Sequence, residues 1–166
     1  MRTWPPIEPM EALSHRHLLT LKLTVDAPGA AIIGSTGSGL RSIVPVVSGT
    51  FAGERLSGRV LHGADWVLAH GDSRMEIDVR LIMETGDGAK IYLTYQGEFR
   101  GEPGALPALA RGEVLADDSY SLSTRARFEC GDKRYSWLND VHAVGTGTQS
   151  GFNPTYQLFE IAPLAK

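Results

Sequence analysis

The stretch RMEIDVRLIMETGDGAKIYLTYQGEFR, residues 74–100, contains two runs of alternating apolar and polar residues joined by Gly86-Asp87-Gly88. Alternation with a period of two is typical of a β-strand, because successive side chains point to opposite faces of a sheet. An Asp-Gly pair supplies the positive φ angles that short hairpins require. The stretch therefore predicts an antiparallel hairpin, and it favours an all-β fold if the pattern recurs.

The pattern recurs on both sides of this hairpin, with glycine-containing turns between the runs. Strands are expected over residues 16–26, 58–61, 65–69, 120–130, 135–144 and 156–161, with a turn at 62–64 and a loop at 146–154. Only the segment 101–119 has helical spacing, which places Leu106, Leu109 and Ala110 on one face of a short helix.

About eight to ten short strands with close turns predict a single antiparallel β-barrel, closed or nearly closed, of the calycin or lipocalin kind. Closure removes exposed strand edges and leaves an interior that can hold one small ligand. We expect one barrel domain over residues 13–166. Residues 1–12 contain three prolines and are expected to form an irregular N-terminal arm.

The composition limits the partners of the protein. The chain has 166 residues and a formal net charge of −3, and its basic residues are scattered, which argues against nucleic-acid binding. The sequence contains neither the apolar run of a signal peptide nor a segment able to cross a bilayer. We therefore expect a cytoplasmic protein with a small-molecule ligand and without a membrane partner, while a homo-oligomer remains open.

Three features allow a functional and a structural interpretation. The single cysteine, Cys130, is interpreted as a buried structural thiol. The histidines are too dispersed for a recognised metal site, so neither a metal nor another cofactor is expected. The segment GSTGSG, residues 34–39, resembles a phosphate-binding loop only superficially, because the Gly-Lys-Ser/Thr sequence is missing. It is interpreted as a mobile loop.

Asp78 and Arg80 introduce opposite charges into the strand predicted from residue 74 to residue 84. If the apolar face of this strand forms the core, the polar face lies in water and the two residues form a structural ion pair. If the apolar face packs outward against covering elements, Asp78 and Arg80 point into the lumen of the barrel. The second arrangement would place a catalytic acid and an anion-binding group in one pocket.

Neighbouring segments offer residues for the same lumen. Tyr92 lies on a polar face of the predicted hairpin, and Trp137 and Asn139 share a face of the predicted strand 135–144. Arg41 could reach over the mouth of the pocket or could simply be solvated. An apolar cavity with a few converging polar groups is the usual form of a small-molecule site.

Asp65 and Trp66 follow the predicted turn at residues 62–64. An acid beside an indole ring can have its pKa raised by desolvation and can then act as a general acid or base. The alternative is that Asp65 caps the turn by accepting backbone hydrogen bonds. We take Asp65, Asp78 and Arg80 as candidate catalytic residues, and Arg41, Trp66, Tyr92, Trp137 and Asn139 as candidate substrate-binding residues.

Three segments resemble one protein family in the same order: residues 39–66, which contain GRVLHGADW, residues 76–97, which contain DVR and TGDGA, and residues 127–147, which contain YSWLN. They are similar to the domain of unknown function 3237 family (DUF 3237, or UPF 0311). The resemblance implies a compact antiparallel barrel of mostly bacterial, uncharacterised proteins. It also implies, from some similar proteins of biosynthetic pathways, action on polyketide-like molecules without a cofactor.

Three functions are consistent with these observations. The first is a cofactor-independent hydrolase, lyase, cyclase or isomerase that uses acid–base chemistry on an aromatic or polyketide-like carbonyl compound. The second is a non-catalytic barrel that binds an apolar small molecule. The third is a structural or partner-binding domain in which Asp78 and Arg80 are buried and paired.

Overall fold

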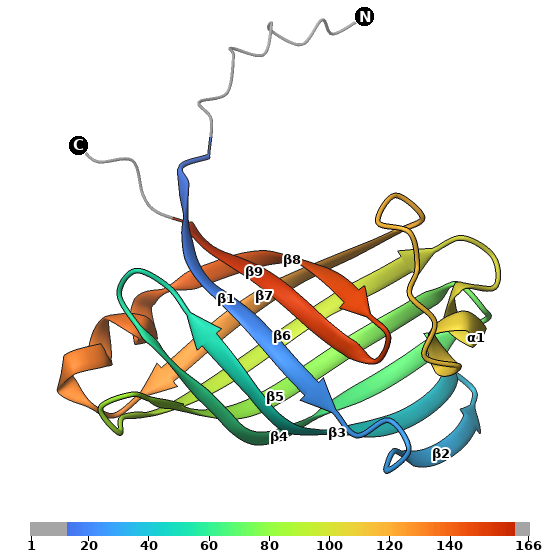
Figure 1. Cartoon of the computed structure of the whole chain (residues 1–166), viewed down its shortest axis with the longest axis horizontal. Helices are drawn as coiled ribbons and strands as arrows, with labels where there is room; N and C mark the ends of the chain where they lie inside the picture. The colour runs from blue at the N-terminus through green and yellow to red at the C-terminus, as the bar shows by residue number, and fades with distance from the viewer. Residues whose placement is uncertain (1–12, 162–166) are drawn as a thin grey trace, which may run out of the picture.

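The computed structural model describes residues 13–161 and shows a twisted barrel of long strands (Figure 1). The elements follow the chain in this order: β1 (His15–Val25), β2 (Ala31–Thr36), β3 (Gly39–Ala52), β4 (Ser57–His70), β5 (Arg74–Thr85), β6 (Lys90–Gly101), α1 (Ala105–Ala110), β7 (Tyr120–Cys130), the 3-10 helix η1 (Lys133–Asp140), β8 (His142–Ser150) and β9 (Asn153–Ile161). The predicted N-terminal arm lies outside the described residues.

The sheet closes on itself. The strand order is β1-β9-β8-β7-β6-β5-β4-β3-β2, every pairing is antiparallel, and an additional pairing of β1 with β3 completes a ring of eight strands. Strand β2 stays outside the ring, because it pairs with the first part of β3 while β1 pairs with the second part. The predicted all-β antiparallel barrel with one short helix is confirmed.

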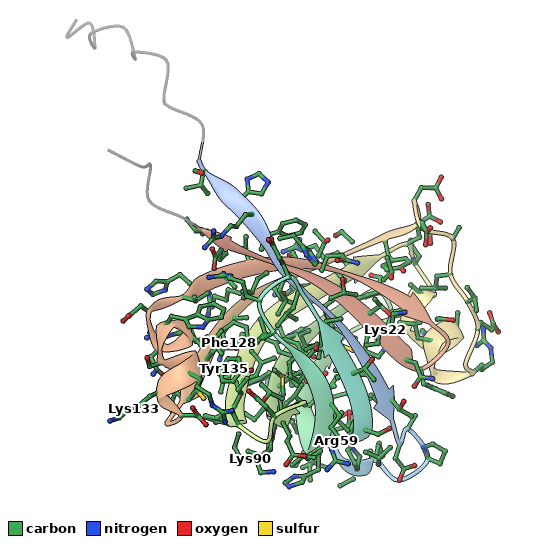
Figure 2. All side chains as sticks on the ribbon, turned by 60° about the vertical axis from the view of Figure 1, so that its left-hand side comes forward. Lys22, Arg59, Lys90, Phe128, Lys133 and Tyr135 are labelled. Carbon is green, nitrogen blue, oxygen red and sulfur yellow. The ribbon has the colours of Figure 1, made fainter. Side chains whose placement is uncertain are left out.

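The hairpin of β5 and β6 determines which face of the sheet is the core. Ile77, Val79, Leu81 and Met83 are all buried, and the residues between them in β5 are more exposed. The apolar face therefore points into the barrel, as expected from the burial of apolar surface. In Figure 2 the exposed side chains of Lys22, Arg59, Lys90 and Lys133 project from the outside of the barrel, and the buried Phe128 lies within it.

The two helical elements lie at opposite ends of the barrel (Figure 1). Helix α1 is joined to the turn between β4 and β5, where the Leu106 amide donates to the Asp72 carbonyl oxygen at 2.8 Å. Helix η1 is joined to the turn between β5 and β6, where Arg134 forms an ion pair with Asp87 at 2.7 Å. Of the helices in the described residues, none is long and apolar enough to cross a membrane.

Strand β4 corrects one prediction, because it runs through the segment 62–64 that was expected to turn. The glycine in this segment has another purpose. A Cβ atom at Gly63 would collide with the Arg80 carbonyl oxygen of β5, so glycine allows the two backbones to approach each other closely. The β-bulge between Val60 and His62 lies immediately before it.

Helix η1 corrects a second prediction, because it contains residues 135–140, which were expected to begin a strand that ran to residue 144. The Asp132 carboxylate accepts a hydrogen bond from the Arg134 amide at 2.9 Å and starts the helix. Strand β8 begins only at His142 and continues to Ser150, which replaces most of the predicted loop at 146–154. Residues 34–39 are also not a loop as a whole: they contain the end of β2 and the turn into β3.

Replacing Gly63 by Ala is expected to lower the free energy of unfolding by about 1–3 kcal/mol, because β4 and β5 must separate to admit the methyl group. Gly86→Ala is the control, since a Cβ atom at Gly86 meets nothing within 4 Å. Urea unfolding of both variants measures the difference. Equal stability of the two variants would show that the close approach at Gly63 does not constrain the barrel.

Candidate active site

A cavity of about 280 Å³ lies inside the barrel at the end that α1 covers. Its volume is near the lower end of the range for small-molecule sites, about 300–1,000 Å³. Most of the lining is apolar and comes from the inner faces of the strands, from α1 and from the hairpin between β8 and β9. The polar side chains in the lining are Ser42, Asp65, Gln149 and Tyr156.

Asp65 is the acid of this cavity. Its side chain points inward from β4, and one carboxylate oxygen accepts a hydrogen bond from the Asp78 amide of β5 at 3.0 Å. The ladder of these two described strands has no paired residues between Asp65–Val79 and Leu68–Glu76. Arg41 satisfies another backbone group there, because its Nη1 donates to the Trp66 carbonyl oxygen at 2.7 Å. The side chains of Asp65 and Arg41 thus replace part of the hydrogen-bond ladder between β4 and β5, and these bonds hold the Asp65 carboxyl group in place.

Burial raises the pKa of Asp65 from 3.8 to about 7. The hydrogen bond from the Asp78 amide opposes this shift, the negative charge of Asp78 adds to it, and the positive charge of Arg41 lowers the pKa again. A carboxyl group with this pKa exists in both protonation states near neutral pH. Asp65 can therefore donate a proton and take one back in a single reaction cycle.

Two tyrosines accompany the acid. The rings of Tyr95 and Tyr156 are 5.0 Å apart and both side chains are buried. Burial raises the pKa of each hydroxyl, and the negative charge of Asp65 raises it further, so both tyrosines remain protonated. Tyr156 lines the cavity, and its protonated hydroxyl can donate a hydrogen bond.

The prediction that Asp78 and Arg80 point into the lumen is wrong. Both lie on the outer face of β5, where the side chains are 33% and 43% exposed and form an ion pair at 3.3 Å. Arg80 lies over the ring of Trp66, 4.6 Å from its centre, so Trp66 also faces outward. Within residues 13–161, helices cover only the ends of the barrel (Figure 1), so the apolar face of β5 has to point inward.

The other predicted binding residues also lie away from the cavity. Arg41 lies on the outer face of β3, whereas its neighbour Ser42 lies on the inner face and lines the cavity. Tyr92 borders a surface depression on the outside of the barrel. Trp137 belongs to η1 and stacks against Arg55, 3.9 Å from its ring centre. Asn139 bonds both backbone groups of Cys130, at 2.8 and 3.0 Å, and so ties η1 to β7.

Of the predicted site residues, only Asp65 lies in the cavity, and Arg41 and Asp78 support it from outside. The sequence did not point to three further residues in and beside the cavity: Tyr95, Tyr156 and Gln149. The alternation of β6 contained a signal for Tyr95, which shares the inner face with Ile91 and Leu93. Cys130 is buried, as expected. In the described part of the chain, no group of three or more His, Cys, Asp or Glu side chains could hold a metal ion.

A family model described as a protein of unknown function, DUF3237, matches residues 13–161. This chain belongs to the DUF3237 family. A UPF0311 protein of Rhodopseudomonas palustris is 35% identical over 117 residues, which are 70% of this chain and 76% of that protein. The resemblance inferred from the three motif segments is therefore confirmed.

Solved structures of relatives have the same fold. The Rhodopseudomonas palustris protein has a TM-score of 0.85 at 28% identity, over 92% of this chain and 100% of that one. A β-barrel-like protein of Acinetobacter baumannii has a TM-score of 0.79 at 32% identity, over 93% and 99% of the two chains.

One relative of this DUF3237 chain is named as an enzyme. The hydroalkoxylation enzyme of Penicillium herquei is 27% identical over 117 residues, which are 70% of this chain and 64% of that protein. The structure of an enzyme from the same organism has a TM-score of 0.67 at 20% identity, over 94% of this chain and 100% of that one. At that identity the structural similarity shows the fold alone.

Proposed function

We propose that this protein is an enzyme that catalyses proton transfer on an apolar, unsaturated carbonyl compound bound in the cavity, with Asp65 as the general acid and base. The observation that carries the proposal is the Asp65 carboxyl group, whose burial in a mostly apolar cavity raises its pKa to about 7. A pKa near the working pH gives a general acid–base its best compromise between availability and driving force.

The reaction that best fits these groups is the addition of a hydroxyl group to a conjugated carbon–carbon double bond of the same molecule. The Asp65 carboxylate takes the hydroxyl proton while the oxygen attacks the β-carbon, and Tyr156 donates a hydrogen bond to the enolate oxygen that forms. Asp65 then returns the proton to the α-carbon. The O–H bond and the π bond break, C–O and C–H bonds form, and no co-reactant is consumed.

Support for this type of reaction comes from two sides. The Penicillium herquei relative is named a hydroalkoxylation enzyme, and hydroalkoxylation is the addition of an O–H group to a multiple bond. The cavity has an acid–base group and a hydrogen-bond donor within a mostly apolar lining, as such a step requires. For a cyclase, this lining also holds a flexible substrate in a folded conformation before the ring closes.

The test uses a series of α,β-unsaturated ketones that carry a hydroxyl group on a tether of varied length. Incubation in deuterated water should yield a cyclic isomer with one deuterium on carbon, in excess of the reaction in buffer, as measured by chromatography and mass spectrometry. Saturable binding of the ketones without an isomer above the buffer rate would contradict the proposal.

A non-catalytic binding barrel is the second candidate, favoured by the predominance of apolar residues in the cavity lining. A carrier of this kind needs no titrating acid and returns its ligand unchanged. Mass spectrometry of the molecule recovered after incubation with the wild type therefore separates the two functions.

A further inference from the structure

The cavity contains no positive charge. Lys, Arg and His side chains are absent from its lining in the part of the chain that the structure describes, and Asp65 is its only carboxylate there. A carboxylate or phosphate on the bound molecule would meet Asp65 in an apolar environment without a counter-ion, which is strongly unfavourable. The cavity therefore disfavours an anionic molecule, and its mostly apolar lining favours an uncharged one.

Gln149 is another polar residue of this cavity, and the proposed chemistry does not use it. Its side-chain oxygen Oε1 is buried, and no residue of the described range 13–161 donates a hydrogen bond to it. Its backbone is held in place, because the backbone N–H of Gln149 donates to the Tyr120 hydroxyl at 2.8 Å. The Tyr120 ring in turn stacks on the ring of Phe99, with the ring centres 5.2 Å apart. A buried acceptor without a donor is a position that a ligand can complete.

Gln149 lies across the cavity from Asp65. Gln149 belongs to β8 and Asp65 to β4, and these strands are four positions apart in either direction around the closed ring of eight. Both side chains line the same cavity. A molecule that fills it therefore has the Asp65 carboxyl group on one side and the side-chain amide of Gln149 on the other.

We propose that Gln149 is a substrate-binding residue whose Oε1 accepts a hydrogen bond from a hydroxyl group, so that the substrates are uncharged, apolar alcohols or phenols. This inference rests on the proposed function in treating the bound molecule as a substrate. The preference of Gln149 for a hydroxyl group can be measured by binding alone, without turnover. The hydroxyl bound by Gln149 is remote from the group that reacts at Asp65. Gln149 thereby orients the molecule in the cavity.

The test compares 2-naphthol with 2-methylnaphthalene, which have similar shapes and differ in the hydroxyl group. Wild-type protein should bind 2-naphthol about tenfold more tightly, the size expected for one buried hydrogen bond. Gln149→Leu should reduce this ratio to about one to two while keeping the affinity for 2-methylnaphthalene, since the unpartnered acceptor is gone. Calorimetric titration measures both affinities, and the NMR shift of the Met75 methyl group places each probe in the cavity.

Gln96→Leu is the matched control, because Gln96 lies on the outer face of β6 and bonds Arg125 at 2.7 Å. It should keep the tenfold ratio. Gln149→Met serves as a second variant if the leucine variant does not fold, and the same loss of preference is expected.

Three results would overturn the inference: an unchanged ratio in both Gln149 variants, a ratio lost in Asp65→Asn but kept in Gln149→Leu, or no binding of either probe to the wild type. The proposed function fails separately. A preference that depends on Gln149, combined with no isomer from the ketone series, supports the binding role and contradicts the catalytic one.

Discussion

Replacing Asp65 by Asn is expected to lower turnover of a cyclising ketone by about two orders of magnitude or more, the usual contribution of a positioned general acid–base. The asparagine oxygen can still accept the hydrogen bond from the Asp78 amide, so the local structure should persist. Only the ability to exchange a proton is lost. The rate of product formation at saturating substrate measures the effect.

Asp78→Asn is the control for this result. Asp78 is an acid of the adjacent strand, its backbone amide still donates to Asp65 after the change, and its own side chain lies outside the barrel. Its turnover should remain close to that of the wild type. If Asp78→Asn lost as much turnover as Asp65→Asn, the loss could not be assigned to proton transfer by Asp65 in the cavity.

The stability of the protein is expected to depend on pH through Asp65. Its pKa is about 7 in the folded protein, against an ordinary value of 3.8 in the unfolded chain, so the folded state binds the extra proton between these values. The free energy of unfolding then falls as the pH rises from 3.8 to about 7. A shift of this size corresponds to about 4 kcal/mol.

Asparagine carries no charge at any of these pH values, so Asp65→Asn should remove this dependence. The variant should resemble the wild type near pH 4 and be more stable near pH 8, by up to about 4 kcal/mol. Urea unfolding at both pH values measures the difference, and Asp78→Asn reports the contribution of the neighbouring acid. Equal pH dependence of wild type and Asp65→Asn would mean that ionising Asp65 does not oppose folding.

A gain in stability together with a loss of turnover is a combination that few roles produce. A purely structural acid, bonded to the Asp78 amide and stabilising the strand pair, would lose stability on replacement. A buried acid kept for its chemistry is destabilising once ionised, and its removal relieves that cost. The stability and turnover of Asp65→Asn, compared with those of Asp78→Asn, therefore distinguish a catalytic acid from a structural one.

The barrel could be predicted from the sequence because its evidence is local. Each run of alternating residues, the Asp87-Gly88 turn and the short helix around Leu106 are visible within a few neighbouring residues. Which face of β5 points into the barrel cannot be predicted from neighbouring residues in this way. Asp78 and Arg80 would face a lumen only if another layer covered the outside of the sheet, and whether such a layer exists is a property of the whole fold.

Two of the local predictions that failed did so because glycine and short polar residues have several uses. Gly63 permits close approach of two strands, although the same residue also ends strands at turns. Residues 135–141 alternate like a strand, but the Asp132 carboxylate caps a 3-10 helix there, which competes with sheet pairing.

Asp65 could be identified as a candidate because an acid between alanine and tryptophan stands out in a strand. Its companions could not be found in the same way. Tyr156 is at the far end of the chain and reaches the cavity because β1 pairs with both β3 and β9. Gln149 was expected in a loop and comes to the cavity only because β8 extends to Ser150.

The pKa of Asp65 is the quantity on which this account depends most directly. An NMR titration of the side-chain carboxyl carbons of ¹³C-aspartate-labelled protein measures it, and the spectrum of Asp65→Asn assigns the signal. The expected midpoint is about 7. A midpoint near the ordinary aspartate value of 3.8 would leave Asp65 ionised throughout the neutral range and would contradict its role as an acid and base.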